Sequence, residues 1–154
     1  MSKDSVTRET VLAFHAGGKI GMRMSKPLQT QTDLCLAYTP GVAHAVREIA
    51  AKPETVFAYT AKRSLVAVVS DGTAILGLGD LGAEASIPVM EGKAVLFKSF
   101  GDVDAWPVPL NHCRQGGANT GKTDPQRVID AVLAIAPMYG GINLEDIAAP
   151  ACFE

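Results

Sequence analysis

Residues 64–98, SLVAVVSDGTAILGLGDLGAEASIPVMEGKAVLFK, decide the fold. Residues 65–69 are almost wholly apolar and β-branched, which is typical of a strand covered on both faces. Asp71-Gly72 predicts a two-residue hairpin turn, because glycine adopts positive φ without steric cost. We expect residues 74–76 to return beside the first strand in antiparallel orientation.

Helices surround this expected hairpin. A glycine turn at residues 77–82 leads into a helix that carries Lys93. Further helices are expected at residues 42–52 and 123–136, where proline and capping residues mark the ends. The order of elements predicts an α/β (α+β) domain: a small sheet with a central Asp-Gly hairpin, flanked by helices, and not itself a Rossmann domain.

The bulk composition limits the class of protein. The 154 residues are enough for one domain, or for one domain and a fragment of another, and 47% of them are apolar, enough for a hydrophobic core. The net charge of −2 disfavours a nucleic-acid surface, which needs clustered basic residues. The three cysteines form no CxxC pair, which fits a reducing cytoplasm better than a disulfide framework or a zinc site. No apolar run predicts a signal peptide or a membrane span.

Residues 77–82, GLGDLG, match the dinucleotide fingerprint GxGxxG, and Asp102 lies 20 residues beyond Gly82. The alternative is a glycine turn that packs a strand against a helix. A Rossmann unit needs parallel strands, whereas the expected hairpin makes the preceding strand antiparallel to its neighbour. We therefore favour the packing turn.

Residues 116–123, GGANTGKT, match the P-loop pattern GxxxxGK[ST]. Pro107 and Pro109 place any strand before this loop at a sheet edge. None of the 31 residues after Thr123 is expected to form the buried strand ending in an acid that a P-loop protein requires. We favour a flexible surface insertion over an ATPase loop.

Glu145-Asp146, beyond Gly140-Gly141, is a candidate metal site. Two neighbouring carboxylates suit Mg²⁺ or Mn²⁺, which prefer oxygen ligands. The alternative is an exposed acidic pair at the start of a helix. Two ligands are too few, so a third must come from elsewhere.

Two other side chains are candidates for proton transfer. Lys93 has apolar sequence neighbours, and loss of hydration favours the neutral amine that a general base requires. Tyr38 precedes a Thr-Pro pair that would hold it rigidly, as a catalytic acid requires, although a core or rim aromatic is the alternative. The three histidines are scattered along the chain, and no Ser-His-Asp or Cys-His arrangement stands out.

Taken together, these motifs resemble the N-terminal domain of bacterial malic enzyme of the small-subunit type. The resemblance covers nearly the whole chain. It rests on six ordered blocks and a tail: GKI (18–20), TDL with LAYTPGVA (32–34, 36–43), VAVVSDGTA (66–74), LGLG (76–79), PVMEGKA (88–94), GGINLEDI (140–147) and APACFE (149–154).

The resemblance implies oxidative decarboxylation of L-malate to pyruvate and CO₂, with reduction of NAD⁺ or NADP⁺. It implies that Lys93 takes the proton from the C2 hydroxyl and that Tyr38 protonates C3 of enolpyruvate. Glu145 and Asp146 are the implied ligands of Mg²⁺ or Mn²⁺. It also implies a homodimer, and a nucleotide site in a later Rossmann domain rather than at residues 77–82.

Two departures from the family pattern matter. The chain ends at Glu154, so we expect the Rossmann domain and the third metal ligand to be missing and the isolated chain to be inactive. Thr73-Ala74 stand where long-chain malic enzymes carry an arginine that holds malate, so the substrate-binding residues are unassigned. The competing hypothesis is a standalone, non-catalytic domain that binds dicarboxylates or dimerises.

Overall fold

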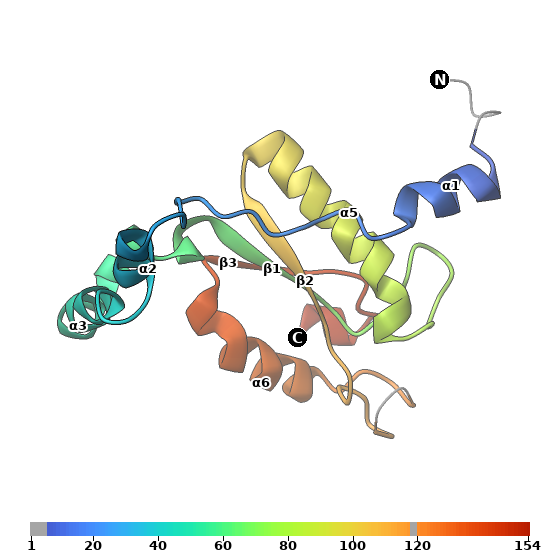
Figure 1. Ribbon diagram of the computed structural model, residues 1–154. Helices are drawn as coiled ribbons and strands as arrows, with labels where there is room; N and C mark the ends of the chain where they lie inside the picture. The colour runs from blue at the N-terminus through green and yellow to red at the C-terminus, as the bar shows by residue number, and fades with distance from the viewer. Residues whose placement is uncertain (1–5, 118–119) are drawn as a thin grey trace.

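The computed structural model describes residues 6–117 and 120–154 (Figure 1). Its helices and strands, in chain order, are α1 (Arg8–His15), α2 (Gln31–Ala37), α3 (Val42–Ala51), α4 (Val56–Tyr59), β1 (Leu65–Ser70), α5 (Ala83–Gly101), β2 (Asp104–Pro109), α6 (Pro125–Ile135) and β3 (Gly141–Leu144). Short 3₁₀ turns lie at Pro53–Thr55, Ala61–Ser64, Ala136–Met138 and Ala151–Phe153.

The three strands form one parallel sheet in the order β2-β1-β3. Helix α5 connects β1 to β2 and packs on both strands, and α6 lies on the other side of the sheet (Figure 1). The predicted α/β class is therefore confirmed. The proline-containing strand β2 lies at an edge, as predicted, because Pro107 and Pro109 have no N–H for a further ladder.

The predicted Asp-Gly hairpin is wrong. Strand β1 pairs only in parallel with its neighbours among the described residues, and no strand returns after Gly72. Instead, the carbonyl oxygen of Gly72 accepts hydrogen bonds from the amides of Leu81 (3.2 Å) and Gly82 (3.1 Å). These bonds close a loop that leads directly into α5, so the sequence Asp-Gly ends a strand here rather than reversing it.

Strand β3 was not expected. It begins at Gly141 and is only four residues long, too short to show an alternating pattern. Strand β3 lies beside β1 and leads into Glu145-Asp146, so a strand followed by an acid does come after Thr123, but its residues are half-buried or exposed and it is not the buried strand that a P-loop protein requires. The sheet thus delivers the acidic pair to the carboxyl end of its strands.

The core lies between the sheet and its helices. Ala67, Val68 and Val69 of β1 are fully buried, α5 packs on β1, and Met90 and Ala94 of α5 are buried as well. A second buried cluster joins Cys113, Val128 and Ile147 beside α6. No described helix has the length and apolar character needed to cross a bilayer.

Helices α1 to α4 differ from this core, since none of them contains a buried residue. We call residues 31–59, which comprise α2, α3 and α4, the helical lobe. Figure 1 shows α2 and α3 beyond the end of the sheet at which β1 begins. The lobe is therefore at the amino end of the strands, and the loops that follow the strands are at the other end.

Candidate functional site

Lys93 and Glu145 meet at the carboxyl end of the sheet. Lys93 projects from α5, and its Nζ lies 3.0 Å from Oε2 of Glu145. The amide of Glu145 donates to the carbonyl oxygen of Val69 (2.8 Å), which ties the residue to the end of β1. Nδ2 of Asn143 donates to the same Oε2 (3.1 Å), so the carboxylate is held from two sides.

The apolar setting predicted for Lys93 is wrong. Its side chain is 34% exposed, and it is paired with the partly buried Glu145 carboxylate. The apolar neighbours in the sequence point to other faces of α5, because adjacent helical positions are about 100° apart. Lys93 therefore presents an ion-paired ammonium group at the edge of the site.

Asp146 lies next to this ion pair in a left-handed conformation (φ 53°). Its main-chain oxygen accepts a hydrogen bond from the amide of Ala74 (3.0 Å), which fixes the turn after β3. Burial raises the pKa of Asp146, the charge of Glu145 raises it further, and Lys93 opposes the shift. Its Oδ2 is buried and has no hydrogen-bond partner among the residues that the structure describes.

The unpaired oxygen fits a cation. A buried carboxylate oxygen normally has a partner, and a divalent ion supplies one while offsetting the charges of both acids. Within the described residues, no group of three histidine, cysteine or acidic side chains could hold a metal ion. Glu145 and Asp146 therefore fit as two ligands of a set that needs a further donor.

The structure does not bring Tyr38 to this site. Tyr38 ends helix α2, and 68% of its surface is exposed. Helix α2 packs on α3 in the helical lobe, at the amino end of the sheet. Of the four residues predicted for the site, three lie together and Tyr38 lies apart.

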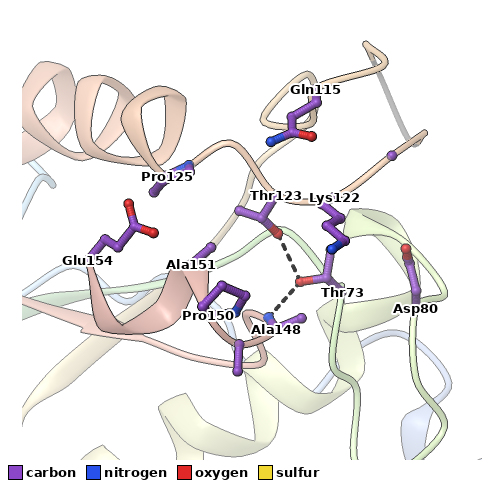
Figure 2. A pocket seen from close by; sticks show the side chains of 12 residues that line it. Thr73, Asp80, Gln115, Lys122, Thr123, Pro125, Ala148, Pro150, Ala151 and Glu154 are labelled. Carbon is purple, nitrogen blue, oxygen red and sulfur yellow. Dashed lines mark hydrogen bonds between the residues drawn. The ribbon is translucent and has the colours of Figure 1, made fainter.

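A buried network next to the site was missed by sequence reasoning. The carboxylate of Asp71, which is 1% exposed, accepts bonds from the hydroxyls of Thr73 (2.6 Å) and Thr123 (2.5 Å). The Thr73 hydroxyl accepts a bond from the amide of Ala148 (2.8 Å), as Figure 2 shows. Asp71 followed two residues later by threonine is a known local turn pattern, but nothing in the sequence indicated Thr123.

This network forms one wall of a cleft of about 620 Å³. Figure 2 shows its lining, which includes Thr73, Asp80, Lys122, Thr123 and Glu154. Lys93, Glu145 and Asp146 do not line this cleft. The amide of Ala74 donates to the main-chain oxygen of Asp146, and the amide of Ala148 donates to the Thr73 hydroxyl. These two bonds connect the loop after β1 to the loop after β3, so the cleft and the acidic pair are built on the same two loops.

Replacing Thr123 with valine is expected to reduce the free energy of unfolding by about 1–3 kcal/mol, because a buried carboxylate oxygen loses its donor. Urea denaturation measures the loss. Thr120→Val is the matched control, since within residues 6–117 and 120–154 the Thr120 hydroxyl donates only to the carbonyl oxygen of Gly116, at the surface. Equal losses in the two variants would contradict the role of the network.

In both glycine motifs, backbone amides donate hydrogen bonds to carbonyl oxygens of the protein itself. In residues 77–82, the amides of Leu81 and Gly82 donate to Gly72, and the Asp80 carboxylate pairs with Arg114. In residues 116–123, of which 118–119 lie outside the described residues, the amide of Gly116 donates to Thr120 (3.1 Å). We expected antiparallel strands to exclude a dinucleotide site, but the strands are parallel. The argument against such a site is instead that the amides of Leu81, Gly82 and Gly116 already donate to acceptors of the protein and are not free to bind a phosphate.

The chain is similar to proteins of one known family. The family model for the malic enzyme N-terminal domain matches residues 17–154. The chain is 52% identical over 141 residues to an NAD-dependent malic enzyme of Geobacillus stearothermophilus, covering 92% of this chain and 27% of that protein. It is 51% identical over 150 residues to an NADP-dependent malic enzyme of Halomonas elongata, covering 96% and 33%.

Solved structures agree with these relatives. A malic enzyme from Pyrococcus horikoshii matches with a TM-score of 0.86 and 51% identity, covering 95% of this chain and 33% of that one. An NAD-dependent malic enzyme from Thermotoga maritima matches with a TM-score of 0.83 and 43% identity, covering 96% and 39%. The chain thus spans between 27% and 39% of the length of these relatives. The family match, these identities and the shared fold show that the chain belongs to the malic enzyme family, as its N-terminal domain.

Proposed function

We propose that this chain is the substrate- and metal-binding part of an enzyme that oxidatively decarboxylates L-malate to pyruvate and CO₂. The observation that carries the proposal is the cluster at the carboxyl end of the sheet. There the Lys93 ammonium pairs with Glu145 at 3.0 Å, next to the unpaired, buried Oδ2 of Asp146. The malic enzyme relatives support this reaction class.

Each residue has a separate task in this proposal. Once the ammonium has released its proton to solvent, the neutral amine of Lys93 accepts the proton of the C2 hydroxyl, and its position beside the acidic pair keeps it within reach of a hydroxyl bound there. Tyr38 returns a proton to C3 of the enolpyruvate that forms when CO₂ leaves. Glu145 and Asp146 hold Mg²⁺ or Mn²⁺, with a third ligand from outside the described residues.

Two bound groups complete the chemistry. When bound, the divalent ion stabilises the developing negative charge as a Lewis acid, and NAD⁺ or NADP⁺ accepts the hydride. We assign the nicotinamide site to residues outside this chain, because the amides of Leu78, Leu81 and Gly82 in the glycine loop are engaged and the relatives are about three times longer or more. Residues 1–154 alone are therefore expected to be inactive.

The test uses the protein expressed from its complete coding sequence. Malate-dependent reduction of NAD⁺ and NADP⁺ is followed by the absorbance of the reduced nicotinamide. Lys93→Ala is expected to lower kcat by about 10²–10⁴, the contribution of a positioned general base. The matched control is Lys98→Ala, on the same helix, because Lys98 pairs with Asp102 and Asp104 at the surface.

A wild-type protein that fails to oxidise malate in the presence of Mn²⁺ and either nucleotide would refute the proposed reaction. Malate binding without turnover, measured by calorimetry, would instead favour the non-catalytic dicarboxylate-binding domain. Full activity in Lys93→Ala would leave the reaction standing and remove Lys93 from it.

A further inference from the structure

The turn that carries Asp146 is held at two points by the loop that follows β1. The main-chain oxygen of Asp146 accepts a hydrogen bond from the amide of Ala74 (3.0 Å). Two residues later, the amide of Ala148 donates to the Thr73 hydroxyl (2.8 Å), a bond drawn in Figure 2. The first bond joins main-chain atoms, which nearly every residue type supplies. The second needs a hydroxyl side chain, so it depends on the identity of residue 73.

Asp146 needs such support because its backbone is left-handed (φ 53°). A residue with a Cβ adopts this conformation at a cost, and the conformation persists where the surrounding bonds impose it. The same backbone conformation sets where the carboxylate points, and Oδ2 is buried with no hydrogen-bond partner among the described residues. Release of the turn would therefore let the backbone relax and carry this oxygen away from its present position.

The buried Asp71 carboxylate orients the Thr73 hydroxyl. A carboxylate only accepts hydrogen bonds, so both hydroxyls that contact Asp71 must donate to it. Thr73 donates to Oδ1 (2.6 Å), and Thr123 donates to Oδ2 (2.5 Å). The lone pairs of the Thr73 oxygen are then left for the amide of Ala148. Asp71, Thr73 and Thr123 are all buried, and the low dielectric of such surroundings strengthens the bonds.

We propose that Thr73 is a positioning residue for Asp146 as a metal ligand. Its hydroxyl, oriented by Asp71, holds the turn so that Oδ2 of Asp146 remains accessible to a divalent cation. In this role Thr73 touches neither the cation nor the substrate. The inference rests on the proposed function, and it adds a residue that sets the affinity of the cation site without being a ligand.

The test measures Mn²⁺ binding by isothermal titration calorimetry, with Mn²⁺ alone and the protein expressed from its complete coding sequence. Thr73→Val keeps the shape of the side chain and removes both bonds of the hydroxyl. We expect the Kd for Mn²⁺ to rise about tenfold, the lower end of the range for groups that hold a metal ligand in place, because the bond between Ala74 and Asp146 remains. Thr73→Ser keeps the hydroxyl and should bind Mn²⁺ as the wild type does.

Thr60→Val is the matched control. The Thr60 hydroxyl also donates to one oxygen, the carbonyl oxygen of Val56 (2.7 Å), and accepts from the amide two residues later, that of Lys62 (3.2 Å). Thr60 comes before β1, at the amino end of the sheet, so the same substitution removes similar bonds away from the proposed cation site. Thr60→Val should keep the wild-type Kd for Mn²⁺, whereas a merely structural role of Thr73 predicts that the two valine variants bind Mn²⁺ alike.

Equal Kd values for the wild type and Thr73→Val would overturn the inference and leave the proposed reaction standing. A Kd raised as much in Thr73→Ser as in Thr73→Val would overturn it too, because serine keeps the hydroxyl. Absence of Mn²⁺ binding by the wild type would refute the cation site of the proposed function, and this inference with it. If circular dichroism shows that Thr73→Val is unfolded, Thr73→Cys takes its place, because a thiol is a weak donor and a weak acceptor. An unchanged Kd in Thr73→Cys would then overturn the inference.

Discussion

Replacing Gly72 with alanine is expected to reduce the free energy of unfolding by about 3 kcal/mol or more, a large part of the 5–15 kcal/mol typical of a domain. Gly72 has φ 69°, and a Cβ there would lie 2.1 Å from the carbonyl oxygen of Gly82. The new Cβ is attached to the backbone at residue 72, and the oxygen belongs to the backbone of Gly82, so the clash is relieved only by shifting the start of α5. Urea denaturation followed by circular dichroism measures the loss.

Gly77→Ala separates the two causes. Gly77 has a similar φ of 74°, but no atom lies within 4 Å of the Cβ position. Only the left-handed conformation is then penalised, at about 1 kcal/mol. Equal losses in the two variants would show that the contact between Gly72 and Gly82 contributes nothing.

The same contact explains why the sequence predicted the wrong connection. Asp-Gly is a local signal for a turn, and it describes two residues only. Whether the chain then returns as a strand depends on Gly82, ten residues later, whose amide bonds the Gly72 carbonyl oxygen. This contact is not visible in the local pattern, so the turn was expected to lead into a hairpin.

Elements with strong periodic or capping signals were predicted well. The uniformly apolar β1 is the central strand, and α6 starts where Asp124 caps it, with Pro125 at its first turn. Strand β3 was missed because four residues carry no usable period. Without β3, the sequence could not predict that Glu145 lies beside the end of β1.

For the site, the residue types indicated metal and proton chemistry, but not which residues meet. Lys93 and Glu145 are 52 residues apart in the sequence, and only the parallel sheet brings them to 3.0 Å. The apolar neighbours of Lys93 predicted burial, whereas its helical phase leaves it partly exposed. The roles of Tyr38, Lys93, Glu145 and Asp146 stay predictions until the variants are assayed.

Replacing Arg114 with alanine is expected to reduce the free energy of unfolding by about 3 kcal/mol, the lower end for breaking a buried ion pair. Its guanidinium is 1% exposed, pairs with the Asp80 carboxylate and donates to the main-chain oxygen of Asp71 (3.1 Å). The bond to Asp80 raises the pKa of Arg114, so the side chain stays charged. The lower end is expected because Asp80 is half exposed and regains water when its partner is removed.

Exposure decides the size of this effect, and the chain offers a matched comparison. Lys98 also pairs with two carboxylates, Asp102 (2.7 Å) and Asp104 (3.0 Å), but at the surface, where water and salt weaken the attraction. Lys98→Ala should therefore leave the urea midpoint unchanged, while Arg114→Ala lowers it.

A double-mutant cycle with Asp80→Ala isolates the buried pair, and we expect a coupling of about 1–3 kcal/mol. Coupling near zero would mean that Arg114 stabilises the protein through packing and its bond to Asp71. The β-bridge between Arg114 and Thr123 would then be attached to the end of β1 and not to the glycine loop. A measurable coupling means instead that Arg114 holds the loop between Gly72 and Gly82 in place, and with it the start of the helix that carries Lys93.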